Sequence, residues 1–233
     1  MRDSHRISVI IPALNEARSI GKVISSLPSW VDDIIVADNG SSDDTVRIAR
    51  SRGARVVHEP RRGYGSACLA GIHSLGKADI VAFLDGDLSD YPEEIYRLVD
   101  PIIQGRADLV IGSRILGKKE KGALTPQARF GNWLSCLLIR LFWGFSFTDL
   151  GPFRAFSLPS LMKLNMADPD YGWTVEMQVK AVQNQLRILE VPVNYRRRLG
   201  KSKISGTLRG VILAGTKILF TIFRLAISSR PSG

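Results

Sequence analysis

The sequence predicts an α/β fold with a mainly parallel central sheet and helices on both of its faces. Three observations support this prediction. Short, mostly β-branched runs alternate with stretches of helical spacing through the first half of the chain, which is the pattern of successive strand–helix units. Hydrophobic residues make up 45% of the 233 residues, enough for a sizeable core. No internal repeat or low-complexity linker interrupts the chain, so we expect one main domain.

The elements of the first half follow in a regular order. The predicted strands are the apolar runs Ile7–Ile11, Ile34–Ala37, Arg55–His58, Ile80–Leu84 and Leu109–Ile111. The first of them is expected to stop at Pro12. The predicted helices between the strands are Ala17–Leu27, Asp43–Arg52, Gly65–Leu75 and Glu93–Ile103. Ligands of such sheets bind at the carboxyl ends of the strands, so the loops there are the first place to look for a site.

The second half of the chain is more basic and more apolar. A lysine-rich loop is expected at Gly117–Gly122, a helix at Tyr171–Gln185 and a short strand at Leu186–Val193. The apolar segment Trp133–Phe147 is rich in aromatic residues, which suits either a lipid interface or an ordinary buried helix. We expect residues 1–205 to form the main domain and residues 206–233 a C-terminal amphipathic helix and tail at a membrane interface.

The distribution of charge along the chain indicates what kind of partner the protein binds. The net charge is +10, with 12 Lys and Arg against 15 Asp and Glu in residues 1–100, and 20 against 7 in residues 101–233. The second half is therefore expected to meet an anion: nucleic acid, a lipid phosphate or an anionic membrane surface. We expect no nucleic acid partner, because no helix-turn-helix, zinc-finger or RNA-binding aromatic motif is present. Cys68 and Cys136 make no disulfide framework, and no signal-peptide pattern opens the sequence, so a cytoplasmic location is expected.

The apolar tail has a narrow polar stripe. Lys217, Thr221, Arg224 and Ser228 recur on one side of a helix, opposite Ile212, Leu219, Ile222, Phe223 and Ala226. Such a helix suits a peripheral position on the cytoplasmic face of an anionic membrane. The alternative is a helix packed on the enzyme or in a dimer interface. The 17 apolar-rich residues Val211–Ile227 are too short and too charged to predict a membrane span.

The strongest local pattern is a pair of carboxylates at the end of the fourth predicted strand. Asp85 and Asp87 are separated by one glycine, so in an extended segment their side chains point to the same side. Two such carboxylates repel each other unless a cation lies between them, and hard oxygen ligands suit Mg²⁺ or Mn²⁺. The alternative is an ordinary turn, since Asp and Gly are common there. Asp90 follows, either as a further ligand or as a helix cap.

Polar residues also follow the first two strands. The segments are Pro12–Glu16 and Asp38–Asp43, and parallel topology would place both on the same edge as Asp85 and Asp87. Helix capping by Asn15, Ser41 or Ser42 explains one residue in each loop, but not three polar clusters on one edge. The first loop lacks Gly-x-Gly-x-x-Gly, which counts against a dinucleotide oxidoreductase.

Together these motifs resemble glycosyltransferase family 2 with the GT-A fold. The resemblance begins in Ser8–Glu16, Asp38–Asp43 and Asp85–Asp87 and covers about residues 6–205. Three later segments are similar to dolichyl-phosphate mannose synthases and related polyprenyl-phosphate glycosyltransferases: Gly112–Arg114, Asp149–Arg154 and Arg197–Lys203. The chain departs from the family pattern at Asn39, where an aspartate is frequent, and at Ser89, where a glutamine is frequent.

The resemblance implies roles for four groups of residues. The nucleotide would contact Pro12, Leu14, Glu16, Ala37, Asp38, Asn39, Asp85, Gly86 and Asp87. The diphosphate would meet Lys203 and one of Arg197 and Arg198. The divalent cation, Mg²⁺ or Mn²⁺, would be held by Asp87 and Ser89, with Asp90 as the alternative to Ser89. The acceptor phosphate would be held by Arg114 and Arg129.

Two further carboxylates are candidates with open alternatives. Glu176 would contact the donor sugar or act as a base, or else pair with Lys180 four residues on. Asp149 would orient the sugar or Arg154, or else form a buried salt bridge with Arg154.

The resemblance implies an inverting, metal-dependent transfer of a sugar from a UDP- or GDP-linked donor. The acceptor would be a polyprenyl (dolichyl-type) phosphate at the membrane surface. A phosphate acceptor needs no general base, because its second pKa is about 6. The alternative is a soluble family 2 enzyme with a hydroxyl acceptor, for which a base such as Glu176 would be needed.

Overall fold

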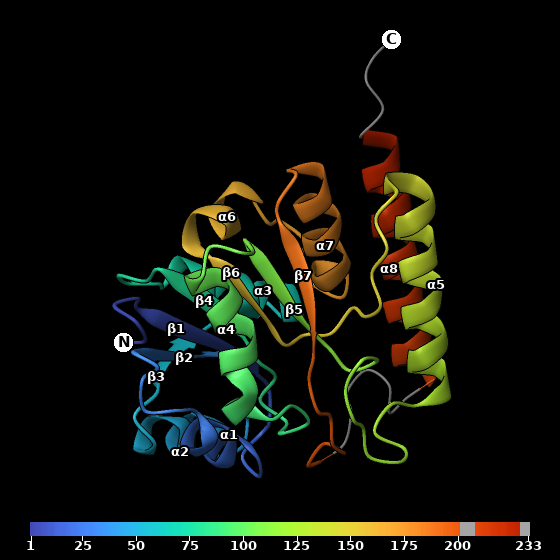
Figure 1. Cartoon of the computed structure of the whole chain (residues 1–233). Coiled ribbons are helices and arrows are strands. Elements are labelled where there is room, and N and C mark those ends of the chain that lie inside the picture. The colour runs from blue at the N-terminus through green and yellow to red at the C-terminus, as the bar shows by residue number, and fades with distance from the viewer. Residues whose placement is uncertain (201–207, 229–233) are drawn as a thin grey trace.

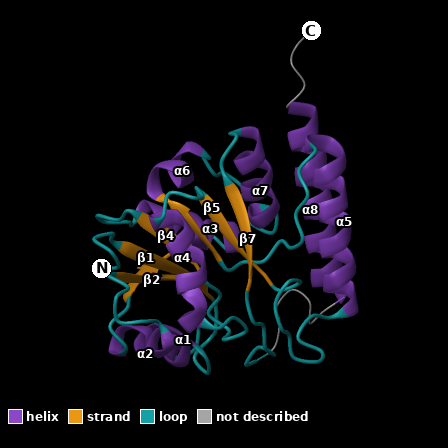
Figure 2. Ribbon diagram, in the orientation of Figure 1, coloured by secondary structure: helices purple, strands orange, loops and turns teal. Residues whose placement is uncertain are grey.

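The computed structural model describes residues 1–200 and 208–228, and it has one seven-stranded sheet between two layers of helices (Figures 1 and 2). The strand order is β3-β2-β1-β4-β6-β5-β7. The strands are β1 (Ile7–Ala13), β2 (Asp33–Asp38), β3 (Arg55–His58), β4 (Ile80–Phe83), β5 (Leu109–Ser113), β6 (Arg154–Ser157) and β7 (Ile188–Pro192). The predicted α/β class is confirmed.

The helices cover both faces of the sheet. They are α1 (Ile20–Ser26), α2 (Thr45–Ser51), α3 (Tyr64–His73), the 3₁₀ turn η1 (Pro92–Ile95), α4 (Tyr96–Ile103), α5 (Pro126–Trp143), α6 (Leu158–Lys163), α7 (Trp173–Gln183) and α8 (Leu208–Ser228). Alternate residues of β1 point to opposite faces, as strand geometry requires. Val9 belongs to the core with α1 and α4, whereas Ile10 belongs to the core with α3 and α7.

The sheet is mainly parallel, with one strand reversed. β1 pairs in parallel with β2 and β4, and β5 pairs in parallel with β7. The sequence did not predict β6, which lies antiparallel between β4 and β5. The expected stop at Pro12 is wrong: β1 continues to Ala13. Its register with β4 ends at Ile10, so Pro12 pairs only with β2 and its missing N–H costs little there.

The C-terminal helix α8 packs on α5 and α7, which confirms the packed alternative for the tail (Figure 1). The expected polar stripe does not face outward. Thr221 is fully buried and Lys217 forms an ion pair with the buried Asp168, whereas Arg224 is exposed. The outer face carries apolar side chains instead, among them Phe220. The predicted domain boundary at residue 205 lies outside the described residues.

None of the described helices combines the length and the apolar character that crossing a membrane requires.

Candidate active site

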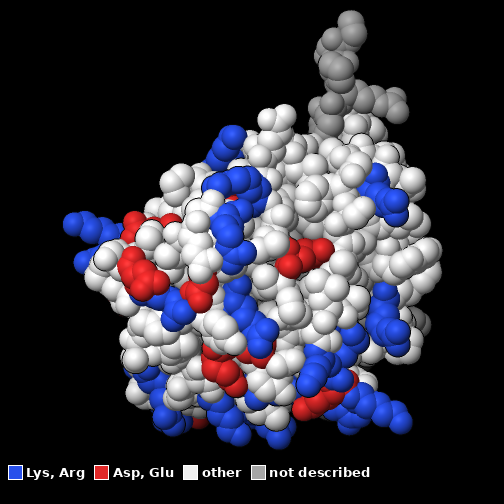
Figure 3. Space-filling view, in the orientation of Figure 1, with Lys and Arg blue, Asp and Glu red and all other residues white. Residues whose placement is uncertain are grey.

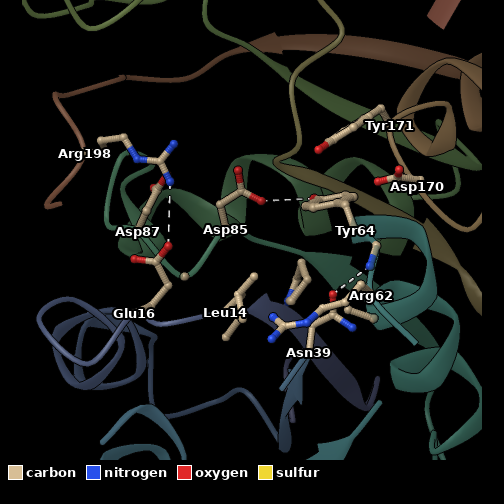
Figure 4. A pocket seen from close by; sticks show the side chains of 15 residues that line it. Leu14, Glu16, Asn39, Arg62, Tyr64, Asp85, Asp87, Asp170, Tyr171 and Arg198 are labelled. Carbon is tan, nitrogen blue, oxygen red and sulfur yellow. Dashed lines mark hydrogen bonds and ion pairs between the residues drawn. The ribbon is translucent and has the colours of Figure 1, made fainter. Parts of the chain in front are cut away.

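A cavity of about 330 Å³ opens at the carboxyl ends of β1, β2 and β4 (Figure 4). Its wall comes from six separate segments of the chain. The lining residues are Pro12, Ala13, Leu14, Glu16, Asn39, Arg62, Gly63, Tyr64, Ala67, Asp85, Gly86, Asp87, Asp170, Tyr171 and Arg198. The cavity therefore lies where parallel sheets bind ligands.

Most residues expected at the nucleotide line this cavity. They are Pro12, Leu14, Glu16, Asn39, Asp85, Gly86, Asp87 and Arg198. The remaining sequence candidates do not line it: Ala37, Asp38, Ser89, Asp90, Arg114, Arg129, Asp149, Glu176 and Arg197. Lys203 lies outside the described residues.

The two strand-end carboxylates occupy different environments within the cavity. The Tyr64 hydroxyl donates a hydrogen bond to Asp85 Oδ1 at 3.0 Å. Burial and the nearby Asp87 raise the pKa of Asp85 to about 7. Asp87 Oδ2 lies 2.7 Å from the guanidinium of Arg198, which also lies 3.7 Å from Glu16 (Figure 4). The backbone N–H of Leu199 donates to the Asp87 carbonyl, which ties the arginine segment to the strand end.

The donor atoms in this corner fit a divalent cation. Like charges this close disfavour ionisation of both carboxylates, and a cation removes the penalty. Asp90 is buried beside them, and neither of its carboxylate oxygens has a hydrogen-bond partner among the described residues. No three His, Cys, Asp or Glu side chains in those residues are grouped as a metal site. Mg²⁺ is usually held by one or two carboxylates plus substrate phosphates, and Asp87 suits that arrangement.

Asn39 holds the loop that forms one wall of the cavity. Its Nδ2 donates to the carbonyls of Glu59 and Arg61 at 3.1 and 2.8 Å, and its Oδ1 accepts from the N–H of Gly63 at 2.8 Å. The amide therefore makes three hydrogen bonds within the protein. These bonds explain why an amide suits this position better than the carboxylate frequent in the family, since a carboxylate cannot donate to two carbonyls.

Replacing Asn39 with aspartate should lower the free energy of unfolding by about 2 kcal/mol, because the carbonyls of Glu59 and Arg61 lose their donor and the buried side chain gains a charge. Asn15→Asp is the matched control: Asn15 is exposed, and its Oδ1 accepts from the N–H of Ser42, a role that a carboxylate oxygen can also fill. Urea unfolding with a chelator present separates this effect from metal binding. Equal stability of the two variants would show that the Asn39 amide does not hold the loop.

Asp38 is a structural residue beside the cavity. Burial acts to raise its pKa, but hydrogen bonds from Ser41, His58 and the N–H of Gly40 outweigh burial and lower the pKa below its ordinary value. Its oxygens accept from the N–H groups of Ser41 and Gly40. The carboxylate thus shapes the turn after β2, and its side chain is 2% exposed.

Glu176 and Asp149 are both engaged in buried structural contacts. Glu176 Oε2 accepts from the N–H groups of Ala167 and Asp168, and its Oε1 lies 2.9 Å from Lys180. The lysine alternative is therefore confirmed for Glu176. Glu176 is buried and does not line the cavity, so an acceptor bound in the cavity would not contact it.

The salt-bridge alternative for Asp149 is wrong in its partner, because no ion pair with Arg154 is found among the described residues. Asp149 instead pairs through two hydrogen bonds with Arg114, at 2.8 and 2.7 Å. Arg154 is buried and donates to backbone carbonyls, including that of Gly151. The Nε and Nη2 atoms of Arg114 are thus engaged by a carboxylate.

The two remaining basic candidates lie elsewhere. Arg197 donates through Nε to the carbonyl of Lys121 at 2.8 Å, so it packs against the lysine-rich loop. Arg129 lies exposed near the start of α5. Of the Arg197 and Arg198 pair, Arg198 is the one that faces the cavity.

Sequence reasoning missed four side chains that line the cavity: Arg62, Tyr64, Asp170 and Tyr171. The available signal is the pair of glycines in Gly63-Tyr64-Gly65, which permits a close approach of backbone. That approach is to the segment before α7: the Pro169 carbonyl accepts from the N–H of Ser66 at 2.8 Å. No local sequence pattern predicts a contact between segments about 100 residues apart.

Comparison with known proteins points to one family of enzymes. The model of glycosyl transferase family 2 matches residues 8–162. An uncharacterized glycosyltransferase of Mycobacterium tuberculosis is 37% identical over 89% of this chain and 94% of its own. Undecaprenyl-phosphate mannosyltransferase of Micrococcus luteus is 30% identical over 88% of this chain and 90% of its own.

A solved structure shows the same architecture. It is glucosyl-3-phosphoglycerate synthase from Mycobacterium tuberculosis in complex with Mn²⁺, UDP-glucose and phosphoglyceric acid. It has a TM-score of 0.77 and 27% identity, and the match covers 99% of this chain and 82% of that one. The GT-A fold implied by the motifs is therefore confirmed. From its motifs, its fold and these relatives, the chain is a member of glycosyltransferase family 2.

Proposed function

We propose that the chain transfers a sugar from a nucleoside diphosphate sugar to a polyprenyl phosphate, at the surface of a membrane. The observation that carries this proposal is the cavity, in which the Asp85 and Asp87 carboxylates and the Arg198 guanidinium meet at the carboxyl ends of the strands. The relative from Micrococcus luteus, named for undecaprenyl phosphate, supports the lipid acceptor. The solved relative holds UDP-glucose, which supports UDP as the nucleotide.

The chemistry follows from the charges around the cavity. An acceptor oxygen attacks the anomeric carbon from the face opposite the leaving nucleoside diphosphate, so the configuration inverts. The leaving group gains negative charge, and preorganised cations stabilise it. Arg198 lines the cavity beside Asp87, where this charge would develop. On donor binding its guanidinium would leave Asp87 and contact the diphosphate instead. A Mg²⁺ or Mn²⁺ ion held by Asp87 would supply Lewis-acid stabilisation of the same oxygens.

The acceptor determines whether a general base is needed. A phosphate monoester has a second pKa of about 6, so its oxygen attacks without losing a proton to the protein. Because Glu176 is buried in structural contacts away from the cavity, it does not serve as a base. A hydroxyl acceptor would therefore need a base other than Glu176.

A second candidate is transfer to a hydroxyl acceptor, as the phosphoglyceric acid in the solved relative suggests. In that case Asp170 would be the base, since it lines the cavity and burial together with Asp168 raises its pKa. The two candidates differ in the product, which is extractable into organic solvent only for the lipid acceptor.

The outer face of α5 and α8 supports the membrane location. It carries exposed apolar side chains at Phe130, Trp133, Leu141, Phe142, Ile212, Leu213, Phe220, Phe223 and Ile227. Neither helix contains an aspartate or glutamate, and Arg140 and Arg224 are exposed on them. In Figure 3 the surface over α5 is mostly uncharged, and the charged atoms on it are basic. An apolar face with a basic margin complements an anionic bilayer.

The double variant Phe220→Ser/Ile227→Ser should weaken binding to vesicles of anionic phospholipid at least about tenfold. Each side chain would lose about 1.5–3 kcal/mol of burial in lipid, and 1.4 kcal/mol is a factor of ten. Met162→Ser is the control, because Met162 on α6 is 58% exposed and Phe220 is 59% exposed. Cosedimentation measures the difference. Equal vesicle binding by both variants would contradict this role of α8.

The proposal as a whole is tested by nucleotide release. With Mn²⁺ and UDP- or GDP-sugars, release of nucleoside diphosphate should depend on added polyprenyl phosphate. Release that depends instead on a soluble hydroxyl acceptor would favour the second candidate.

A further inference from the structure

The segment between α6 and α7 lies between the cavity and α8. Asp170 and Tyr171 line the cavity (Figure 4). Asp168, two residues earlier, is 2% exposed and contacts α8. Its Oδ2 lies 3.1 Å from Lys217 Nζ, and it accepts a hydrogen bond from the Thr221 hydroxyl at 3.4 Å. One short segment thus contacts the cavity on one side and the C-terminal helix on the other.

The same segment is packed tightly against the start of α3. The Pro169 carbonyl accepts hydrogen bonds from the backbone N–H and the hydroxyl of Ser66, at 2.8 and 3.1 Å. A Cβ on Gly65 would lie 2.0 Å from the Asp168 carbonyl oxygen. Tyr64, which donates to Asp85, is the neighbour of this glycine. A shift of the segment would therefore move the wall that orients Asp85.

The contact with α8 is equally close. A Cβ on Gly172 would lie 2.4 Å from both Asp168 Oδ2 and the Thr221 hydroxyl oxygen. Thr221 is fully buried, and the side chain of Asp168 is 1% exposed in its ion pair with Lys217. Buried ion pairs contribute little net stability compared with apolar packing, but breaking one leaves an uncompensated charge. Lys217 is 31% exposed, but loss of its charge would leave the buried Asp168 carboxylate uncompensated, so the pair favours this one position of the segment.

We infer that Lys217 and Thr221 are positioning residues for donor binding, which hold Asp170 and Tyr171 at the cavity through Asp168. The inference rests on the proposed function, since it takes the cavity ligand to be a nucleoside diphosphate sugar. It adds a means of regulation: α8 carries both this inner contact and the apolar outer face. Contact of that face with lipid would stabilise the docked helix and so favour the cavity that binds the donor.

The test is binding of UDP and of GDP, each with Mn²⁺, to the full chain and its Lys217→Met variant. The dissociation constant of the nucleotide that binds should rise about tenfold, within the range usual for coupling between sites. Lys217→Arg should restore it, because the guanidinium keeps the charge near Asp168. Without vesicles, Arg224→Met is the matched control: Arg224 is exposed on the same helix, and the nucleotide affinity of this variant should not change.

A second variant keeps the test decisive if Lys217→Met fails to fold. Thr221→Val removes one hydrogen bond and no charge, and it should raise the same dissociation constant about threefold. If nucleotide binds both variants as tightly as the unaltered chain, the inference is overturned. If the unaltered chain binds neither nucleotide, the proposed function fails instead. Vesicles should tighten nucleotide binding by the unaltered chain, and no change on their addition would overturn the regulatory part.

Discussion

Replacing Asp87 with asparagine should lower sugar transfer at least about a thousandfold. The side chain keeps its shape but loses the charge that faces the Arg198 guanidinium at 2.7 Å and would face the divalent cation. Loss of a single preorganised electrostatic group typically costs 10²–10³ in rate, and loss of the metal adds to this cost. The measurement is kcat/KM for transfer at saturating Mn²⁺.

Two controls separate chemistry from folding. Asp44→Asn changes an exposed aspartate whose partner is Arg47, and it should leave transfer unchanged. The melting temperature of the Asp87 variant is measured beside its activity, because the substitution relieves repulsion from Asp85 but also breaks the ion pair with Arg198. Transfer by Asp87→Asn within tenfold of the unaltered chain would exclude this residue as the cation ligand.

The second large effect is expected at the paired arginines after β7. Arg198→Met should lower kcat/KM about 10²–10³-fold, because the leaving diphosphate loses a preorganised cation. Arg197→Met should change it only a few fold, since that side chain donates to the carbonyl of Lys121 and does not line the cavity. The pair are sequence neighbours of equal charge, so each is the control for the other.

Equal losses in both variants would mean that the segment acts through its total charge. A larger loss in Arg197→Met than in Arg198→Met would mean that the segment rearranges around the donor, and that Arg197 takes the position assigned to Arg198. Either result would contradict the geometry of this corner.

Much of the sheet could be predicted from the sequence for a simple physical reason. Parallel strands are buried on both faces, so β1, β2 and β4 appear as short apolar runs between helical stretches. β6 could not be recognised in this way, because its four residues Arg154–Ser157 include no β-branched residue, whereas the equally short β3 contains Val56 and Val57. Arg154 is tolerated in the interior because backbone carbonyls accept its hydrogen bonds, a feature that exists only in the folded chain.

The orientation of α8 shows a second limit. The helical spacing identified Lys217 and Thr221 as one face, and polarity alone suggested that this face meets water or headgroups. Their partner Asp168 lies about 50 residues earlier in the chain, so no local sequence pattern predicts these contacts. With the polar pair turned inward, apolar residues such as Phe220 and Phe223 are left on the outer surface.

The site was predictable where it depends on strand ends and not where it depends on distant contacts. Asp85, Asp87 and Glu16 come together because the carboxyl ends of parallel strands share one edge. Tyr64 and Asp170 reach the same cavity only because the segment before α7 packs against the glycines that begin α3. That approach brings together parts of the chain about 100 residues apart.

The most direct measurement of the central claim is the transfer of labelled sugar into lipid. Purified protein would receive UDP- or GDP-linked labelled sugars and Mn²⁺, with polyprenyl phosphate or with phosphoglyceric acid. We predict label in the butanol-extractable lipid that depends on polyprenyl phosphate and disappears with EDTA. Label only in a water-soluble product formed with phosphoglyceric acid would contradict the lipid acceptor and assign the enzyme to hydroxyl acceptors.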